Sequence, residues 1–204
     1  QLVAEVHHRV KNNLQIVGSL LNLQANRMVG EEARTALLMA RDRVRVLSLL
    51  HRHLYVDEEP VGLDMRTFLP LLCAQLVQSA GEDVRRQVEM TVLSDNISLA
   101  IAQTTPVALM IAEMVSNALS HAFPDERRGT VLVRLSRQEG GLRLEVRDDG
   151  IGLPRDPFLT PVYGLGFQLI KVFVRQISGQ CECHYAAGTG FIVVWPQDVA
   201  PRAV

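Results

Sequence analysis

The chain has 204 residues, of which 48% are hydrophobic, and a formal charge of −1. This is a globular composition with enough apolar residues for one or two domains with their own cores. The near-zero charge argues against nucleic acid as the main partner, and no run approaches the roughly 18 apolar residues of a membrane span, so we expect no direct membrane contact in this stretch. Three cysteines are too few for a disulfide framework, which favours reduced thiols and a cytoplasmic location.

A long helix is predicted at the start of the chain, because apolar residues recur there with heptad spacing and neither Gly nor Pro occurs before Gly18. His8 lies in the middle of the polar face of this helix, with Glu5 and Asn12 about one turn away on either side. The adjacent His7 flanks the apolar stripe instead. The polar face is either a chemical site centred on His8 or an ordinary solvated surface. The stripe itself comprises Val3, Val6, Val10, Val17 and Leu20.

A second helical pattern runs from about Glu31 to Tyr55, after a break at Gly30. Two long helices joined by a tight turn form an antiparallel hairpin. One hairpin cannot bury two wide apolar stripes, so we expect a homodimer through residues 1–55 that forms a four-helix bundle. The alternative is a hairpin that packs on the rest of its own chain. Because the pattern is already helical at Gln1, we also expect more chain upstream.

Residues 57–62 are a polar break with Pro and Gly, which predicts a helical domain over 1–58 and a second domain over 62–204. In the second domain, Thr105 and Pro106 are predicted to begin a central helix, as N-cap and first helical residue. Because strands and helices do not alternate strictly, we expect an α/β sandwich with a mixed sheet. Helices are predicted over 64–80, 105–122 and 164–179, and strands over 88–92, 130–136, 142–147, 180–185 and 190–195.

Three short motifs of the second domain carry its chemistry. Glu113 and Asn117 lie four residues apart on the predicted central helix, away from its apolar stripe, and their oxygens suit Mg²⁺. Residues 148–152, Asp-Asp-Gly-Ile-Gly, end a strand, where glycines allow close approach and a carboxylate accepts from an exocyclic amine. Residues 164–166, Gly-Leu-Gly, begin a helix whose free N–H groups suit phosphate. Each motif alone also fits an ordinary surface or turn; the three in this order indicate a nucleotide site.

With these motifs, the chain resembles the cytoplasmic core of bacterial sensor histidine kinases with a HisKA_2 phospho-acceptor, close to the HWE group. The resemblance covers essentially the whole chain and rests on residues 5–15, 113–119, 148–153 and 164–166. It implies a dimerisation and histidine-phosphotransfer hairpin, followed by an ATP-binding α/β sandwich of the Bergerat type that is shared with gyrase, Hsp90 and MutL.

The resemblance also implies a role for each motif residue. The catalytic residues would be His8 as phospho-acceptor, with Glu5 and Asn12 beside it. Asn117 would be the metal ligand, with Glu113 next to it, and Asp148 would bind the adenine amine. The other positions expected to bind the nucleotide are His121, Gly150, Gly152, Gly164, Leu165 and Gly166.

The chain departs from the family pattern at three places. Arg9 follows the acceptor, where the commonest histidine kinases have an acidic base, so Glu5 is the candidate base. Ser120 stands where many relatives have a lysine, and the lid segment, residues 153–163, is short. Candidates to supply the missing phosphate contact are His121, Arg127 and Arg128.

The function expected from the resemblance is an ATP- and Mg²⁺-dependent protein histidine kinase. It would phosphorylate His8 and pass the phosphoryl group to an aspartate of a response regulator, under control of an upstream sensor domain. One alternative is a histidine phosphotransferase whose ATP site has decayed, so that it only relays phosphate. Another is a Bergerat ATPase that does mechanical work, which would not need the His8 helix.

Overall fold

The computed structural model of the protein describes residues 2–54, 62–155, 157, 164–185 and 187–197, without the side chains of residues 2–5, 7, 8 and 164. The chain divides into two compact units, residues 1–61 and 62–204. Among the described residues, none of the helices combines the length and the apolar content that crossing a bilayer requires.

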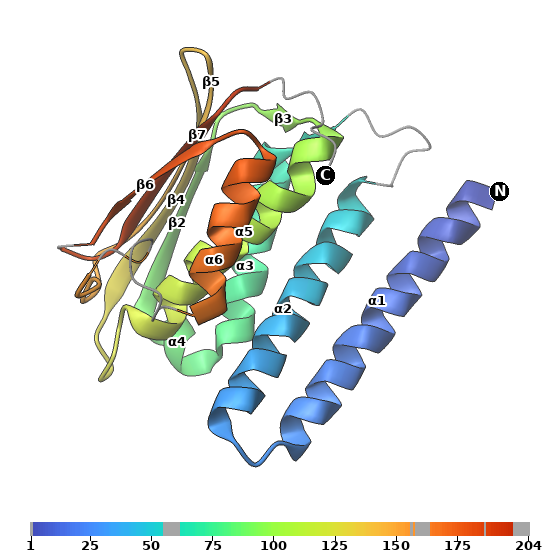
Figure 1. Cartoon of the computed structure of the whole chain (residues 1–204), viewed down its shortest axis with the longest axis horizontal. Helices are drawn as coiled ribbons and strands as arrows, with labels where there is room; N and C mark the ends of the chain where they lie inside the picture. Colours follow the sequence, from blue (N-terminus) through green and yellow to red (C-terminus); the bar gives the residue numbers. More distant parts are fainter. Residues whose placement is uncertain (1, 55–61, 156, 158–163, 186, 198–204) are drawn as a thin grey trace. The chain divides into compact units, whose positions relative to one another are not determined.

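The first unit is an antiparallel hairpin of α1 (Leu2–Arg27) and α2 (Glu31–Leu54) (Figure 1). Residues 28–30 connect the two helices, and backbone hydrogen bonds close the adjoining helix ends, with Met28 N donating back to Ala25 O at 3.2 Å and Arg34 N donating to Gly30 O at 3.0 Å. Gly18 faces α2, where a Cβ atom would make an ordinary contact with Val44 Cγ1 at 3.9 Å. The predicted hairpin is confirmed.

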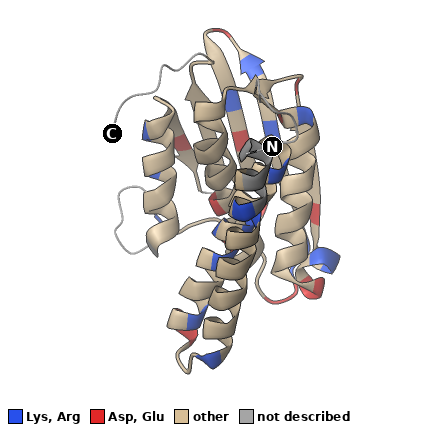
Figure 2. Cartoon of the chain, turned by 90° about the vertical axis from the view of Figure 1, so that its right-hand side faces the viewer, with Lys and Arg blue, Asp and Glu red and all other residues tan. Residues whose placement is uncertain are grey.

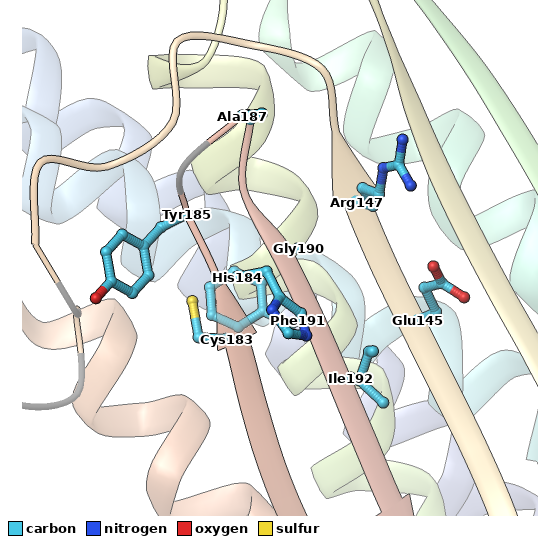
Figure 3. Close-up of a pocket in the computed structure, with 10 residues that line it drawn as sticks. Glu145, Arg147, Cys183, His184, Tyr185, Ala187, Gly190, Phe191 and Ile192 are labelled. Atoms are coloured by element: carbon cyan, nitrogen blue, oxygen red, sulfur yellow. The ribbon is translucent and has the colours of Figure 1, made fainter.

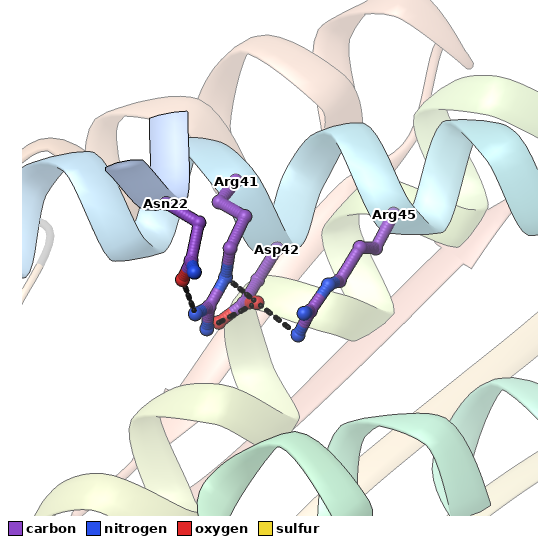
Figure 4. A network of polar contacts seen from close by, with 4 residues as sticks. All are labelled: Asn22, Arg41, Asp42 and Arg45. Atoms are coloured by element: carbon purple, nitrogen blue, oxygen red, sulfur yellow. Dashed lines mark hydrogen bonds and ion pairs between the residues drawn. The ribbon is translucent and has the colours of Figure 1, made fainter. Parts of the chain in front are cut away.

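A polar network ties α1 to α2 (Figure 4). Arg41 of α2 donates through Nη1 to Asn22 Oδ1 of α1 at 2.9 Å, and through Nε to Asp42 Oδ1 at 2.9 Å. Arg45 lies 3.4 Å from the same carboxylate oxygen. A polar contact with a fixed partner favours one register between helices whose apolar stripes would otherwise pack in several.

Apolar side chains remain exposed along α1. An uncovered apolar stripe of this kind is typical of a surface that binds protein. It includes three members of the stripe predicted from the heptad spacing, Val6, Val17 and Leu20. The exposed fractions are 52% for Val6, 57% for Ile16, 43% for Val17, 53% for Leu20 and 56% for Leu23.

The second unit is an α/β sandwich built on a five-stranded mixed sheet with the order β2-β4-β5-β7-β6. Only β2 and β4 pair in parallel, and every other neighbouring pair is antiparallel. The strands are β2 (Val88–Ser94), β4 (Gly129–Gln138), β5 (Gly141–Asp148), β6 (Gln180–His184) and β7 (Gly190–Trp195). A separate two-stranded sheet pairs β1 (Leu63–Asp64) with β3 (Ser98–Leu99). The predicted fold class is confirmed.

The larger helices of this unit cover one face of the sheet (Figure 1). They are α3 (Met65–Ala80), α5 (Ile101–His121) and α6 (Gly164–Gln176); a short α4 (Glu82–Gln87) follows α3. Alternate strand residues such as Val131, Val133 and Leu144 are fully buried under them. Helix α5 lies between α3 and α6 and is buried over most of its circumference. Side chains in the middle of α5 are therefore shielded from water.

The predicted start of the central helix is wrong. Helix α5 begins at Ile101 rather than at Thr105, and Pro106 lies inside it. The additional first turn is held by a tertiary contact that no local pattern indicates, because the buried Gln103 donates through Nε2 to Pro196 O and to Gln197 O, both at 3.1 Å. The short α4, β1 and β3 were not predicted either.

Charged side chains are distributed over both units. Figure 2 shows Lys and Arg interspersed with Asp and Glu along the helices and strands, without a broad field of one sign. This distribution agrees with the formal charge of −1.

Candidate active site

The first and third motifs meet at one point of the second unit. Gly166, in the first turn of α6, packs directly against α5, so that a Cβ atom there would lie 3.0 Å from Glu113 Oε2 and 3.7 Å from both amide atoms of Asn117. Glu113 is only 4% exposed, so it does not lie on an ordinary solvated surface, and Asn117 beside it is half-buried. The absence of a side chain at Gly166 leaves room beside the carboxylate and the amide.

The residues at this point fit a hard divalent cation. A carboxylate from Glu113 and a carboxamide from Asn117 supply oxygen ligands of the kind that Mg²⁺ prefers, and Mg²⁺ usually keeps several waters in addition. Asn117 Nδ2 is buried and has no hydrogen-bond partner among the described residues. A buried amide donor without a protein partner is unusual and suits an acceptor on a ligand, such as a phosphate oxygen, whereas a cation would bind the amide through Oδ1.

Asp148 ends β5 and is also buried, at 4% exposed. Its Oδ1 accepts from Gly150 N at 2.9 Å and from Thr189 N at 3.0 Å. Burial raises the pKa of Asp148 above its ordinary value, although the two backbone donors act in the opposite direction and the Asp149 charge adds to the rise. A buried carboxylate with one oxygen fixed by backbone is suited to accept from a ligand amine through the other.

Glycines allow the backbone to close around Asp148. A side chain at Gly150 would place its Cβ 2.3 Å from Ala122 O, and one at Gly188 would place it 2.1 Å from Asp148 O. Gly152 has a φ of +72°, which disfavours a side chain irrespective of the space around it. Ile151 N donates to Ala122 O at 3.0 Å, so the end of α5 holds the loop.

Two residues of this pocket were missed by the sequence reasoning. Thr189 donates its N–H to the Asp148 carboxylate and accepts from Asp148 N at 2.8 Å, and Gly188 makes that approach possible. They lie 40 and 41 residues after Asp148 in the chain. The only local signal is the Gly-Thr-Gly run at 188–190 immediately before an alternating strand, which reads equally well as a turn.

The residues considered for phosphate contacts lie in different surroundings. Ser120 and His121 are exposed in the last turn of α5. Arg127 donates through Nη2 to Asp149 O at 2.9 Å, so this guanidinium is bound to the glycine loop. Leu165 is 58% exposed at the start of α6, one residue after Gly164.

The predicted residues of the hairpin lie on α1. Asn12 is exposed there, whereas the side chains of His8 and Glu5 lie outside the described residues, although their backbone is helical. The lid prediction over residues 153–163 also falls mostly outside the described part of the chain.

A separate cavity of about 700 Å³ opens at the ends of β5, β6 and β7 (Figure 3). Its lining includes Glu145, Arg147, His184 and Tyr185 but neither Asp148 nor Asn117. Figure 3 shows Arg147, Glu145 and Ile192 on the β5 side of the cavity, with Cys183 and Tyr185 on the β6 side. The sequence did not point to it.

The fold and the site together define a class of ATP-binding signalling kinases. In this class a helical hairpin precedes an α/β sandwich that carries a buried carboxylate, a glycine loop, and a carboxylate and an amide beside the start of a helix. Family comparisons agree with that class. Residues 5–80 match the HisKA_2 histidine kinase family, and residues 102–199 match the histidine kinase-, DNA gyrase B- and HSP90-like ATPase family. The chain belongs to the sensor histidine kinase family, as a HisKA_2 phospho-acceptor region joined to an ATPase domain.

Individual relatives agree with this family. The sensor histidine kinase PdtaS of Mycobacterium tuberculosis is 36% identical over 205 residues, covering 98% of this chain and 40% of that protein. Blue-light-activated histidine kinase 2 of Erythrobacter litoralis is 28% identical over 193 residues, covering 94% of this chain and 55% of the relative. The chain thus spans about half or less of these relatives.

A solved structure has the same fold. The histidine kinase domain of the Erythrobacter litoralis EL346 blue-light-activated kinase superposes with a TM-score of 0.71 at 21% identity, covering 91% of this chain and 96% of that one.

Proposed function

We propose that this chain is the catalytic core of a cytoplasmic, homodimeric sensor histidine kinase that phosphorylates its own His8 from ATP. The observation that supports the proposal is the arrangement of the motif residues, in which Asp148 is buried and held by backbone donors while Gly166 packs on Glu113 and Asn117. A chain that only relayed phosphate would have no reason to keep a desolvated carboxylate, because burying one costs free energy unless it serves a partner.

In the proposed reaction, a ring nitrogen of His8 attacks the γ-phosphorus of ATP. A nitrogen–phosphorus bond forms, the bond to the bridging oxygen breaks, and ADP leaves with that oxygen. The ring proton passes to Glu5, one turn earlier on α1. The protein's main contribution is positioning, together with neutralisation of the phosphate charge.

Several groups of the chain have defined roles in this proposal. Asp148 accepts from the adenine amine, the glycines at 150, 152, 164 and 166 bring backbone close to the nucleotide, and Leu165 and His121 border the phosphates. Asn117 holds Mg²⁺ with Glu113 beside it, and the cation supplies charge neutralisation at the phosphates when bound. Asn12, one turn after His8, would orient a water for the opposing phosphatase reaction.

The hairpin supplies the partner surfaces. The exposed stripe on α1 supports a homodimer through residues 1–55, since five large apolar side chains are left uncovered in one copy. The phosphoryl group then passes from His8 to an aspartate of a response regulator receiver domain, and an upstream sensor domain controls the reaction in the full-length protein.

The acceptor is tested by incubating the chain with ATP and mapping acid-labile, alkali-stable phosphate by mass spectrometry. His8→Ala is expected to abolish the label while nucleotide affinity stays within twofold. The matched variant is His7→Ala, which removes the adjacent imidazole. The heptad spacing predicts that His7 flanks the apolar stripe, so this variant is expected to retain labelling. Phosphate on His7 alone would contradict the proposed acceptor, and nucleotide hydrolysis without any labelled histidine would favour a plain ATPase.

A further inference from the structure

A cluster of contacts around Asp149 has no part in the proposed reaction. Its Oδ1 accepts from Thr130 N at 2.7 Å and its Oδ2 accepts from Thr130 Oγ1 at 2.9 Å. Its own N–H donates to Thr130 O at 3.3 Å, and its carbonyl accepts from Arg127 Nη2 at 2.9 Å. Every polar group of Asp149, on the backbone and on the side chain, is thus bound to Thr130 or Arg127.

The position of Asp149 in the sheet explains why this cluster matters. Strands β4 and β5 pair in a register that places Val131 opposite Asp148, so that Thr130 and Asp149 form the next pair. Successive residues of a strand point to opposite faces, and Asp148 is buried whereas Asp149 is exposed. Asp149 is therefore the last residue fixed to the sheet before the chain enters the glycine loop.

The neighbouring residues make room for this contact. Gly129 precedes Thr130, and a Cβ atom there would lie 2.5 Å from Asp149 Oδ1 and within 2.0 Å of the Phe123 ring. Only glycine at 129 allows the carboxylate to reach the Thr130 N–H. Burial acts to raise the pKa of Asp149, but the Thr130 donors and the Arg127 charge outweigh it and the pKa is lowered. The acceptor is thus charged at neutral pH, which strengthens its hydrogen bonds.

We propose that Asp149, held by Thr130 and Arg127, is a positioning residue that sets the direction of the adjacent Asp148 carboxylate and so the preference of the site for an aminated purine. The inference rests on the proposed role of Asp148 as acceptor for the adenine amine. Beyond Asp149 the chain has Gly150 and Gly152, which supply little stiffness of their own. Thr189 holds Asp148 from one side, and the Thr130 and Arg127 contacts hold the next residue from the β4 side, so loss of these contacts changes the direction of the Asp148 carboxylate.

The test compares two ligands that differ only in the amine, ADP and purine riboside 5′-diphosphate, bound to the intact chain in calorimetry. The wild type is expected to prefer ADP by roughly 10- to 150-fold, the range of a hydrogen bond to a charged group. Thr130→Val removes the hydroxyl donor and is expected to reduce that preference about three- to tenfold, with the affinity for the analogue changed less than about twofold.

Matched variants separate positioning from general support of the fold. Thr130→Ser keeps the hydroxyl and should restore the wild-type preference. Thr91→Val removes an exposed hydroxyl from the adjacent strand β2 and should leave it unchanged. Arg127→Ala, at an exposed position that does not threaten folding, should lower the preference in the same direction as Thr130→Val.

Equal loss of affinity for both ligands in Thr130→Val and Arg127→Ala would overturn the positioning role, because a merely structural contact does not distinguish the two bases. An unchanged preference in both variants would overturn it as well. A wild type that binds both diphosphates equally would instead contradict the adenine role of Asp148 and the inference with it, whereas labelling of His8 would remain as a separate test of the kinase activity.

Discussion

The Asp148 carboxylate is held by two backbone donors, but its burial disfavours the charged form. Asp148→Asn keeps an oxygen for the Gly150 and Thr189 donors but presents an amide to the adenine amine, so we expect ATP affinity to fall by about 30- to 1000-fold, corresponding to about 2–4 kcal/mol. Calorimetric titration measures this. Near wild-type affinity would place the adenine elsewhere, and Glu182→Gln, an exposed amide substitution on β6, is the control.

The same residue makes stability depend on pH. Because the pKa of Asp148 is raised in the folded state, the folded protein binds this proton more tightly than the unfolded chain does. The free energy of unfolding contributed by Asp148 therefore falls as the pH rises from the ordinary aspartate range through the raised value. Asp148→Asn removes this decline. The melting temperature of the variant minus that of the wild type should therefore increase as the pH is raised from about 4 to about 7. A difference that does not change with pH would show that the carboxylate is not desolvated.

Gly166 provides a test of the phosphate end of the site. A methyl group there would lie 3.0 Å from Glu113 Oε2, a contact that the flexible carboxylate can relieve only by moving. We expect Gly166→Ala to leave stability unchanged or raised by up to about 1 kcal/mol, because alanine favours helix, and to slow autophosphorylation about tenfold. Gly18→Ala, at a helical glycine where a Cβ atom would make only an ordinary contact with Val44 Cγ1 at 3.9 Å, should not alter nucleotide affinity. Wild-type rates in Gly166→Ala would remove this glycine from the site.

At the scale of elements, α1 carries the expected dimer contact. Leu20→Ala removes a side chain that is 53% exposed and that a two-fold interface would bury twice, so dimerisation should weaken by about 2–3 kcal/mol, or 30- to 150-fold. Sedimentation equilibrium measures the dissociation constant. Leu71→Ala, at an exposed leucine of α3, is the control. A fragment of residues 62–204 that remained dimeric would contradict this assignment of the interface.

At the scale of the whole molecule, the division into two compact units predicts two separable unfolding transitions. ADP at 100 times its dissociation constant should stabilise only the unit of residues 62–204, by about 2.7 kcal/mol. Raising the protein concentration should shift only the hairpin transition, because that transition includes dissociation. Scanning calorimetry at several ligand and protein concentrations distinguishes the two, and a single transition that moves with both variables would show one cooperative unit.

The sequence by itself determined the elements and the motifs that rest on short spacings. The hairpin followed from heptad spacing and the break at Gly30, and the strands followed from the alternation of apolar residues, because both patterns are periodicities of the backbone itself. The alternation in residues 130–136 and 142–147 was sufficient to predict β4 and β5. The motif residues Glu113, Asp148 and Gly166 were likewise proposed from local pattern and resemblance, and their roles stay predictions.

Only the tertiary structure decided the features that join residues distant in sequence. Gln103 extends α5 by one turn through bonds to Pro196 and Gln197, more than 90 residues away. Thr189 completes the Asp148 pocket from the position just before β7, and Thr130 anchors Asp149 from β4. Hydrogen bonds of this kind depend on which strands become neighbours, and strand order is set by packing of the whole domain rather than by any window of the sequence. Burial has the same origin, since Glu113 reads as a polar surface residue until α6 covers it.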